Sequence, residues 1–363
     1  MHIPDGYLSP ATCAALGAAS VPFWYQASRR IRKVVKSRYV PLVAIGAAFS
    51  FLVMMFNIPV PDGTTAHAVG AVLVAVVLGP WAAVIAVSIA LAIQALFFGD
   101  GGVLAFGANA FNMAVLMPFA GYAVYRLIAR STSLTSHRRA VAAGIGGYVG
   151  INVAALAAAV EFGIQPLLFH TSAGTPLYAP FHLSQTIPAM MLAHVTVAGL
   201  AEFVVAAGVI AYLQRANVPI LRINHADVPV TDEELERRRK LGWRWVLVGM
   251  GVTILLTPLG LLAPGGAFGE DVPADLDLGR YNLKAVPAGL ERFSSFWSHT
   301  LLGGYGFESG QHAALAYILS AILGIVVIGL SCLGLYGLYR LVRRRRGHGS
   351  GDPPEERLEE VAA

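Results

Sequence analysis

The chain has 363 residues, of which 56% are hydrophobic and only 13% are charged, and its mean hydropathy is +0.63. Because soluble domains carry about 25% charged residues, this composition excludes a soluble enzyme, a disordered chain and a fibrous protein. The formal charge of +5 does not indicate nucleic-acid binding, since the basic residues form short clusters between apolar runs instead of a stripe interleaved with aromatics.

The first apolar segment, residues 8–28, is not preceded by any Lys or Arg; the first basic cluster, residues 29–38, follows it. A cleaved signal peptide has the reverse order, with positive charge before the apolar run. We therefore expect the N-terminus to be retained and to lie outside, with the basic loop in the cytoplasm.

Apolar runs of about 20 residues cross a bilayer as helices. They predict an all-α polytopic membrane bundle of about nine transmembrane helices, seven plus two. The predicted spans are 8–28, 39–57, 61–79, 80–98, 109–129, 139–162, 186–213, 244–263 and 312–340.

The sequence Gly79-Pro80-Trp81 is either a tight turn between two spans or a kink in one long helix. With a turn, all but three of the 26 Lys and Arg residues fall in cytoplasmic segments, as the positive-inside rule requires. With a kink, the basic residues of 126–139 face the exterior. We therefore predict the turn, an N-terminus outside and a cytoplasmic C-terminus.

Changes in composition divide the chain into four parts. The predicted parts are a seven-helix membrane domain (1–215), a charged cytoplasmic linker that includes a short helix (216–243), a two-helix module with an outer loop at 264–311 (244–342), and a basic and then disordered tail (343–363).

Met1 and His2 are a candidate metal-binding pair. The free amine of Met1, the backbone nitrogen of His2 and a ring nitrogen of His2 can bind one cation in a five-membered and then a six-membered chelate ring. A fourth nitrogen completes a square-planar set, which is typical of Ni(II) or Cu(II). A Met-His start is by itself more often a disordered end, but here an apolar helix follows at once and Pro4 restricts the segment.

His67 is the predicted fourth ligand, because it opens the third span on the same, outer side as Met1. The alternative is a histidine at a helix end with its ring in water. Rival ligands on the outer side or within a span are His170, His182, His194, His299 and His312. Histidines in cytoplasmic segments are excluded: His137, His225 and His348.

The opening Met1-His-Ile-Pro-Asp-Gly-Tyr-Leu-Ser-Pro10 resembles that of the CbiM/NikM family, the metal-binding membrane components of energy-coupling factor (ECF) cobalt and nickel importers. Further blocks that resemble the family lie within 1–215: His67-Ala-Val-Gly, Leu78-Gly-Pro-Trp-Ala-Ala83, Gln94-Ala-Leu-Phe-Phe-Gly-Asp-Gly-Gly102, Gly107-Ala-Asn-Ala-Phe-Asn-Met113, and Ala193-His-Val-Thr-Val-Ala-Gly199 with Glu202. The resemblance implies that Met1, His2 and His67 hold the metal.

The last two spans resemble the small CbiN/NikN-type partner of this family, fused here to the first domain. Val286-Pro-Ala-Gly-Leu-Glu-Arg-Phe293 is similar to the Pro-Asp-Gly-Leu-Glu signature of such modules, but Ala288 replaces the aspartate. We therefore assign no role to a carboxylate at that position.

Gln94, Asn109 and Asn112 flank the loop at 99–102. One hypothesis is that they hydrogen-bond the ligand histidines or seal the N-terminal arm, since metal-bound imidazoles need oriented partners. The alternative is helix capping and hydrogen bonding between helices. Three aspartates on the outer side are interpreted as turn formers that attract cations, and are excluded from the donor set: Asp5, Asp62 and Asp100.

His194 and Glu202 lie about two helical turns apart on one side of the seventh span. Ionisable groups inside a bilayer are functional suspects. The two are either structural, paired with each other or with Glu161, or part of a surface for a partner subunit.

The chain has no Gly-Lys dipeptide and hence no phosphate-binding loop of the G-x-x-x-x-G-K-[ST] type. ATP must therefore be hydrolysed elsewhere, and the resemblance implies two ATPase subunits and a transmembrane coupling (T) subunit. The predicted function is the substrate-binding component of an ECF-type importer of Ni²⁺ or Co²⁺ in the cell membrane. No enzymatic activity, organic cofactor or nucleic acid is expected.

Two other classes are less well supported by the sequence. An ion-driven secondary carrier needs carboxylates within the membrane for coupling, and Glu202 alone is thin support. An intramembrane metalloenzyme is disfavoured because the chain has no H-E-x-x-H motif. Planar nitrogen ligation favours Ni(II), but Co(II) can occupy the same donors, so the metal is not decided.

Overall fold

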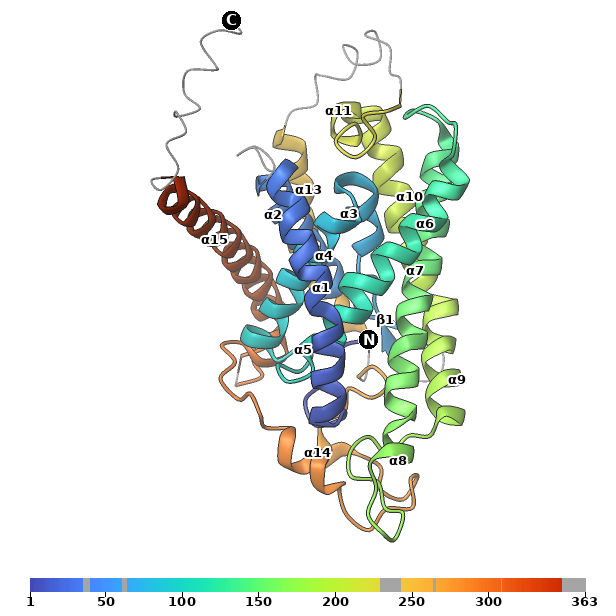
Figure 1. Cartoon of the computed structure of the whole chain (residues 1–363). Coiled ribbons are helices and arrows are strands. Elements are labelled where there is room, and N and C mark those ends of the chain that lie inside the picture. The colour runs from blue at the N-terminus through green and yellow to red at the C-terminus, as the bar shows by residue number, and fades with distance from the viewer. Residues whose placement is uncertain (35–39, 61–63, 229–242, 264–265, 308, 348–363) are drawn as a thin grey trace, which may run out of the picture.

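A computed structural model describes residues 1–34, 40–60, 64–228, 243–263, 266–307 and 309–347 (Figure 1). Asp62, the greater part of the predicted charged helix in the linker and the predicted disordered tail lie outside these described residues.

Most apolar runs of the sequence form long helices aligned in one bundle (Figure 1). The helices are α1 (Pro10–Val34), α2 (Val40–Met54), α4 (Pro80–Ile93), α5 (Phe106–Asn109), α6 (Met117–Ala129), α7 (His137–Gly163), α9 (Leu183–Ala193), α10 (Gly199–Ala216), α13 (Trp243–Leu256) and α15 (Ala313–Gly347). Three π-helical segments continue or join them: Gln94–Phe98 after α4, Ala110–Leu116 between α5 and α6, and His194–Ala198 between α9 and α10.

Within the described residues, five helices are long and apolar enough to cross a membrane: Pro80–Phe98, Phe106–Ala129, His137–Leu168, Leu183–Ala216 and Ala313–Leu338. Two apolar helices, Val40–Met54 and Leu247–Leu262, are shorter. The predicted helical membrane bundle is confirmed. The total of nine spans and the orientation of the termini stay predictions.

The predicted span at 61–79 is wrong, because its helical part, α3 (Ala71–Leu78), has only eight residues. Such a helix is about 12 Å long and cannot cross a hydrocarbon core of about 30 Å. Proline and glycine interrupt the run before it: strands β1 (Ile58–Pro59) and β2 (Thr65–Ala66) form a short antiparallel pair, and Gly70 has a positive φ of 74° at the start of α3.

The turn at Gly79-Pro80 is confirmed. Gly79 adopts φ 92°, a conformation that favours glycine, and Pro80 occupies the first turn of α4, where its missing N–H costs nothing. The chain therefore reverses direction between α3 and α4, and the segment carrying His67 lies among the helices instead of forming one.

Helix α7 packs against α6, α9 and α10. Glycines allow the closest approach: a Cβ added at Gly146 would meet the carbonyl oxygen of Gly121 on α6, and a Cβ at Gly150 would meet that of Met117. Helix α15 packs on α2, with Gly324 against the ring of Phe51. The last helix is thus in direct contact with α2.

Short helices mark the two ends of the bundle (Figure 1). One end carries α8 (Gln165–Leu168) and α14 (Ala288–Phe293), and the opposite end carries α11 (Val218–Leu221). The segment 266–307 is joined to the first domain by backbone hydrogen bonds, from Gly289 N–H to Leu177 O (2.7 Å) and from Leu301 N–H to Phe97 O (2.9 Å). It therefore covers the end where the N-terminal arm enters.

Candidate metal centre

The first nine residues form an arm that is buried inside the bundle (Figure 1). The exposed fractions of Ile3 and Leu8 are 0%, and that of Tyr7 is 1%. Apolar side chains therefore anchor the arm, and the terminal methionine, 4% exposed, is held among the helices instead of trailing in solvent.

Hydrogen bonds fix the backbone of the arm in register. Ile3 N–H donates to Asn109 Oδ1 (2.8 Å), and Ile3 O accepts from Asn109 Nδ2 (3.0 Å) and from the N–H of Gly102 (2.8 Å). Ser9 N–H donates to Gln165 Oε1 (2.9 Å). Asn109 therefore seals the arm, one of the two roles considered from the sequence, and contacts the backbone rather than a histidine.

Asp5 joins the arm to the loop that precedes α5. Its carboxylate accepts the N–H groups of Val103 (3.0 Å) and Ala105 (3.0 Å). Burial raises the pKa of Asp5, and these backbone hydrogen bonds act in the opposite direction. Gly102 is required beside it, because a Cβ there would collide with the Asp5 carboxylate.

The rings of His2 and His67 are stacked, with centroids 5.0 Å apart and an interplanar angle of 22°. His2 is 2% exposed and His67 is 5% exposed. The Nε2 atoms of both rings are buried without a hydrogen-bond partner. An unpartnered buried polar atom is costly, and the free Nε2 of His67 matches the requirement of a site that binds a cation.

Two carboxylates hold the other candidate donors. The Met1 amine lies 2.7 Å from Glu270 Oε1, and His2 Nδ1 lies 2.8 Å from Asp100 Oδ1. The six-membered chelate ring expected from the sequence uses His2 Nδ1. Both donors must therefore leave these carboxylates when a planar set of nitrogens forms.

Asp100 is held by three side chains. Its second oxygen accepts from Gln94 Nε2 (3.1 Å) and from the hydroxyl of Tyr305. Burial alone would raise the pKa of Asp100, but the neighbouring His2 ring and the Tyr305 hydroxyl outweigh it and hold this pKa below its usual range. Asp100 is thus an ionised group that orients His2.

The loop carrying His67 is fixed by Glu202. The carboxylate of Glu202 accepts the N–H groups of Val69 (2.8 Å) and Gly70 (3.0 Å), and His67 Nδ1 lies 3.0 Å from the carbonyl oxygen of Ala68. Burial, with the positive charge of the Met1 amine, holds the pKa of His67 well below its ordinary value. The ring is therefore neutral, as a metal ligand must be.

The remaining polar residues singled out from the sequence have other partners. Asn112 donates to Glu161 Oε2 (2.8 Å), and His194 Nδ1 lies 2.7 Å from the carbonyl oxygen of Met190. Neither hydrogen-bonds His2 or His67. The alternative in which His194 and Glu202 pair with each other or with Glu161 is wrong: His194 contacts a backbone carbonyl, Glu202 accepts two backbone N–H groups, and Glu161 accepts from Asn112.

The π-helical segments coincide with these polar positions. Gln94 begins the first, Asn112 lies in the second and His194 begins the third. Such segments are frequent at functional sites. A π-helical turn has one more residue than an α-helical turn, which changes the direction of the side chains that follow. All three side chains are buried.

The rival outer histidines differ from the stacked pair in burial. Four of them have exposed side chains: His170, His182, His299 and His312. Within the described residues, no three side chains of His, Cys, Asp or Glu gather closely enough to hold a metal ion. A site here therefore depends on the terminal amine and a backbone nitrogen in addition to the two rings.

Two residues near the arm were not expected from the sequence, Glu270 and Tyr305. The acidic character of the stretch at 270–277 was visible, but nothing in it indicated a contact with a residue 269 positions away. Asp100 was interpreted as a turn former. Asp100 lies between Gly99 and Gly101, and glycines on both sides are typical of a loop that approaches another backbone closely.

A cavity of about 220 Å³ lies beside these groups. Four carboxylate residues line it: Asp5, Asp100, Glu270 and Asp271. Its walls come from the arm, the loop at 99–103 and the segment 270–273, so it lies directly next to the two donor–carboxylate pairs.

Comparison with known proteins agrees with this fold. The profile of the family described as CbiM, cobalt uptake substrate-specific transmembrane region, matches residues 2–220. A fused nickel transport protein NikMN of Rhodobacter capsulatus is 48% identical over 359 residues, which cover 96% of this chain and 100% of that protein. A probable fused nickel transport protein LarMN of Lactiplantibacillus plantarum is 44% identical, over 92% of this chain and 97% of that protein.

A crystal structure of a transition metal transporter also matches, with a TM-score of 0.56 and 57% identity. The match covers 59% of this chain and 92% of that one. The apolar helices and these relatives define a helical membrane protein of metal-ion transport. The chain belongs to the CbiM family, and its relatives over nearly the full length are fused nickel transport proteins.

Proposed function

We propose that this protein is the substrate-binding component of an ECF-type importer for nickel or cobalt ions. It captures the ion on the extracytoplasmic side with the Met1 amine, the backbone and ring nitrogens of His2, and His67. The ion is the transported substrate. Its passage is powered by ATPase subunits and a transmembrane coupling subunit, since the chain has no phosphate-binding loop of its own.

The observation that carries the proposal is the buried terminal amine beside the stacked rings of His2 and His67, where His67 Nε2 is buried without a hydrogen-bond partner. The buried terminus supplies an amine and a backbone nitrogen in chelating positions, which no ordinary side chain provides. Four nitrogens in one plane suit Ni(II), and Co(II) can occupy the same donors.

The acidic cavity supports a route to these nitrogens. Its carboxylates attract a divalent cation, and two of them, Glu270 and Asp100, already contact the amine and the His2 ring. When the ion binds, the amine and the amide must lose protons, and the carboxylates remain as counter-charges beside the complex.

Adding one glycine before Met1 tests the chelate. The extension moves the amine away from the His2 nitrogens without changing any side chain, so we expect tight Ni²⁺ binding, measured by calorimetry, to be lost. A matched variant replaces His182, an exposed rival histidine, with alanine and should bind as the unaltered chain does. Unchanged affinity after the extension contradicts the proposal.

Transport by the importer is tested in vesicles. Uptake that needs ATP and the partner subunits supports the importer, whereas uptake by this chain alone, driven by a proton gradient, contradicts it and supports a secondary carrier. Mass spectrometry of the intact protein from its native membrane, with an unmodified Met1 as the expected first residue, is the necessary companion measurement.

A further inference from the structure

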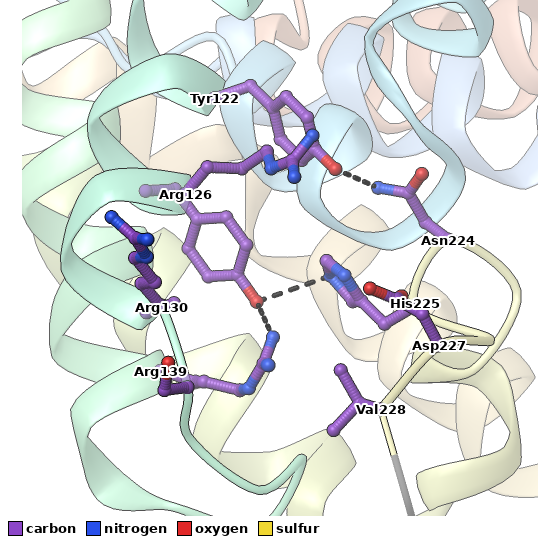
Figure 2. Close-up of a pocket in the computed structure, with 11 residues that line it drawn as sticks. Tyr122, Arg126, Arg130, Arg139, Asn224, His225, Asp227 and Val228 are labelled. Carbon is purple, nitrogen blue, oxygen red and sulfur yellow. Dashed lines mark hydrogen bonds between the residues drawn. The ribbon is translucent and has the colours of Figure 1, made fainter.

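A second cavity lies at the opposite end of the bundle from the candidate metal centre, and has a volume of about 250 Å³ (Figure 2). It is formed by the end of α6, the start of α7 and the segment that follows α11. Its lining is polar and basic, and includes Tyr122, Tyr125, Arg126, Arg130, Arg139, Asn224, His225 and Asp227.

The arginines of this cavity carry more charge than their neighbours neutralise. Arg126 and Arg130, one turn apart at the end of α6, form no ion pair or hydrogen bond with a described residue. Arg139 on α7 is only 5% exposed and likewise has no described carboxylate partner. Asp227 is the acidic residue among those that line the cavity, so three positive charges face one negative charge.

A fixed network holds the buried arginine in place. Arg139 Nη1 donates to the hydroxyl oxygen of Tyr125 (2.8 Å), and its Nη2 donates to the carbonyl oxygen of Thr132 (2.8 Å). The Tyr125 oxygen lies 3.2 Å from Nε2 of His225 (Figure 2). Burial lowers the pKa of His225 to about 4, so this ring is neutral and its Nε2 accepts a hydrogen bond from the Tyr125 hydroxyl.

The far wall is also fixed, because Asn224 Nδ2 donates to the hydroxyl oxygen of Tyr122 (3.0 Å) and to the carbonyl oxygen of Ala75 (3.2 Å) (Figure 2). A buried guanidinium without a counter-charge is destabilising. A cavity built with fixed walls around such a group is therefore complementary to an anion, and Asp227 is the one carboxylate that the described residues place in its lining.

The position of the cavity along the bundle indicates which kind of anion it binds. The apolar span that contains α6 ends at Ala129, and the next begins at His137. The cavity is lined by the last residues of the first of these spans and by residues just beyond it, so in a bilayer it would lie near the lipid headgroups. Its end of the bundle is the one that we propose faces the cytoplasm, where basic pockets between transmembrane helices bind anionic headgroups.

We infer that this cavity binds a phosphate group, and that the phosphate belongs to an anionic phospholipid of the surrounding membrane. Arg126 and Arg130 reach the phosphate from α6, and Arg139 supplies fixed charge behind it. Arginine suits this role because its planar fork donates two hydrogen bonds to adjacent phosphate oxygens. The inference does not depend on the proposed metal function.

The test uses the full chain in detergent and measures binding of phosphatidylglycerol by native mass spectrometry. The double variant Arg126→Gln/Arg130→Gln should bind it at least about tenfold more weakly, since each lost charge-assisted hydrogen bond costs roughly that factor. The matched control is Arg138→Gln/Arg215→Gln, which removes two exposed charges from the same end of the bundle but none from the cavity. It should stay within about threefold of the unaltered chain, as surface charges contribute little.

Competition identifies the source of the phosphate. Failure of millimolar inorganic phosphate or glycerol phosphate to displace phosphatidylglycerol supports the lipid. If inorganic phosphate or glycerol phosphate displaces the lipid, and the Arg126→Gln/Arg130→Gln variant no longer binds that soluble anion, the cavity is a phosphate site for a soluble ligand. This result overturns the lipid as the source of the phosphate. Equal binding of phosphatidylglycerol by all variants overturns the inference. The inference is also overturned if the double variant binds the lipid normally but fails to assemble with the ATPase and coupling subunits, because the basic cavity is then a docking site for protein.

A folding control keeps the test decisive. The Arg126→Lys/Arg130→Lys variant keeps both charges and should recover part of the lost binding. Nickel binding at the distant centre should be equal in all variants. A loss of lipid binding that lysine does not relieve, in variants that still bind nickel, contradicts a charge-based phosphate site.

Discussion

Replacing Asn109 with alanine is the most informative perturbation of the N-terminal arm. The Asn109 amide makes two hydrogen bonds to the backbone of Ile3, at 2.8 and 3.0 Å, and is 2% exposed. In the variant, Ile3 O keeps the N–H of Gly102 as a donor at 2.8 Å, but Ile3 N–H is left buried without an acceptor.

The expected cost follows from that single orphaned donor. A buried N–H that loses its partner costs about 1–3 kcal/mol. Taking about 2 kcal/mol, the equilibrium between the docked and undocked arm shifts about 30-fold toward the undocked state. Because only the docked arm aligns its nitrogens with His67, nickel affinity should fall in the same direction.

Hydrogen exchange of residues 3–8, followed by mass spectrometry, measures the docking directly, and competition with a coloured chelator measures the nickel affinity. Asn152→Ala is the matched control: this amide also donates to a backbone carbonyl, that of Tyr148, but far from the arm in sequence. If exchange in the Asn109 variant is no faster than in the control, these two hydrogen bonds do not hold the arm in place.

Three further predictions concern separate residues. Glu270→Ala removes one of the carboxylates that attract the cation into the acidic cavity, so nickel should bind several times more slowly in stopped-flow measurements. Gly102→Ala introduces a Cβ that collides with the carboxylate of the arm, so exchange of the arm should accelerate and the melting temperature should fall. Burial lowers the pKa of His225 to about 4, so the folded state binds a proton at this ring less well than the unfolded state does. The free energy of unfolding should therefore be highest above about pH 6.5 and fall by roughly 3 kcal/mol as the pH drops to about 4. Melting experiments on the His225→Gln variant should show a smaller loss.

Matched variants serve as controls for these predictions. Glu291→Ala removes an exposed carboxylate from the same outer segment and should leave nickel association unchanged. Gly208→Ala, with open space around the added Cβ, should leave the melting temperature unchanged or raise it slightly. Equal effects in a variant and its control, or an identical pH profile with and without His225, would contradict the corresponding prediction.

Hydropathy and charge were sufficient to predict the helical bundle, because a span must satisfy its own backbone hydrogen bonds and be apolar over its whole length. They failed at α3. The residues before it are apolar enough to count as membrane-embedded, but hydropathy does not distinguish a helix from an irregular segment that other helices surround, and Gly70 allows the latter.

The residues of the candidate site were likewise predictable only in part. Met1 and His2 are neighbours in the chain, so their chelating geometry follows from covalent structure alone. His67 came from its position at the start of a span. The contact of Glu270 with the Met1 amine depends on how the segment 266–307 packs, and no local pattern contains that information. Glu202 likewise acts on the backbone of Val69 across 133 positions, and its partner was not predictable.

X-ray absorption spectroscopy of the nickel-loaded protein identifies the donor atoms around the ion. We expect four nitrogen donors in a square plane around diamagnetic Ni(II), and loss of one nitrogen in the His67→Ala variant. A six-coordinate ion with mostly oxygen donors, or a spectrum that His67→Ala leaves unchanged, would contradict the proposed donor set.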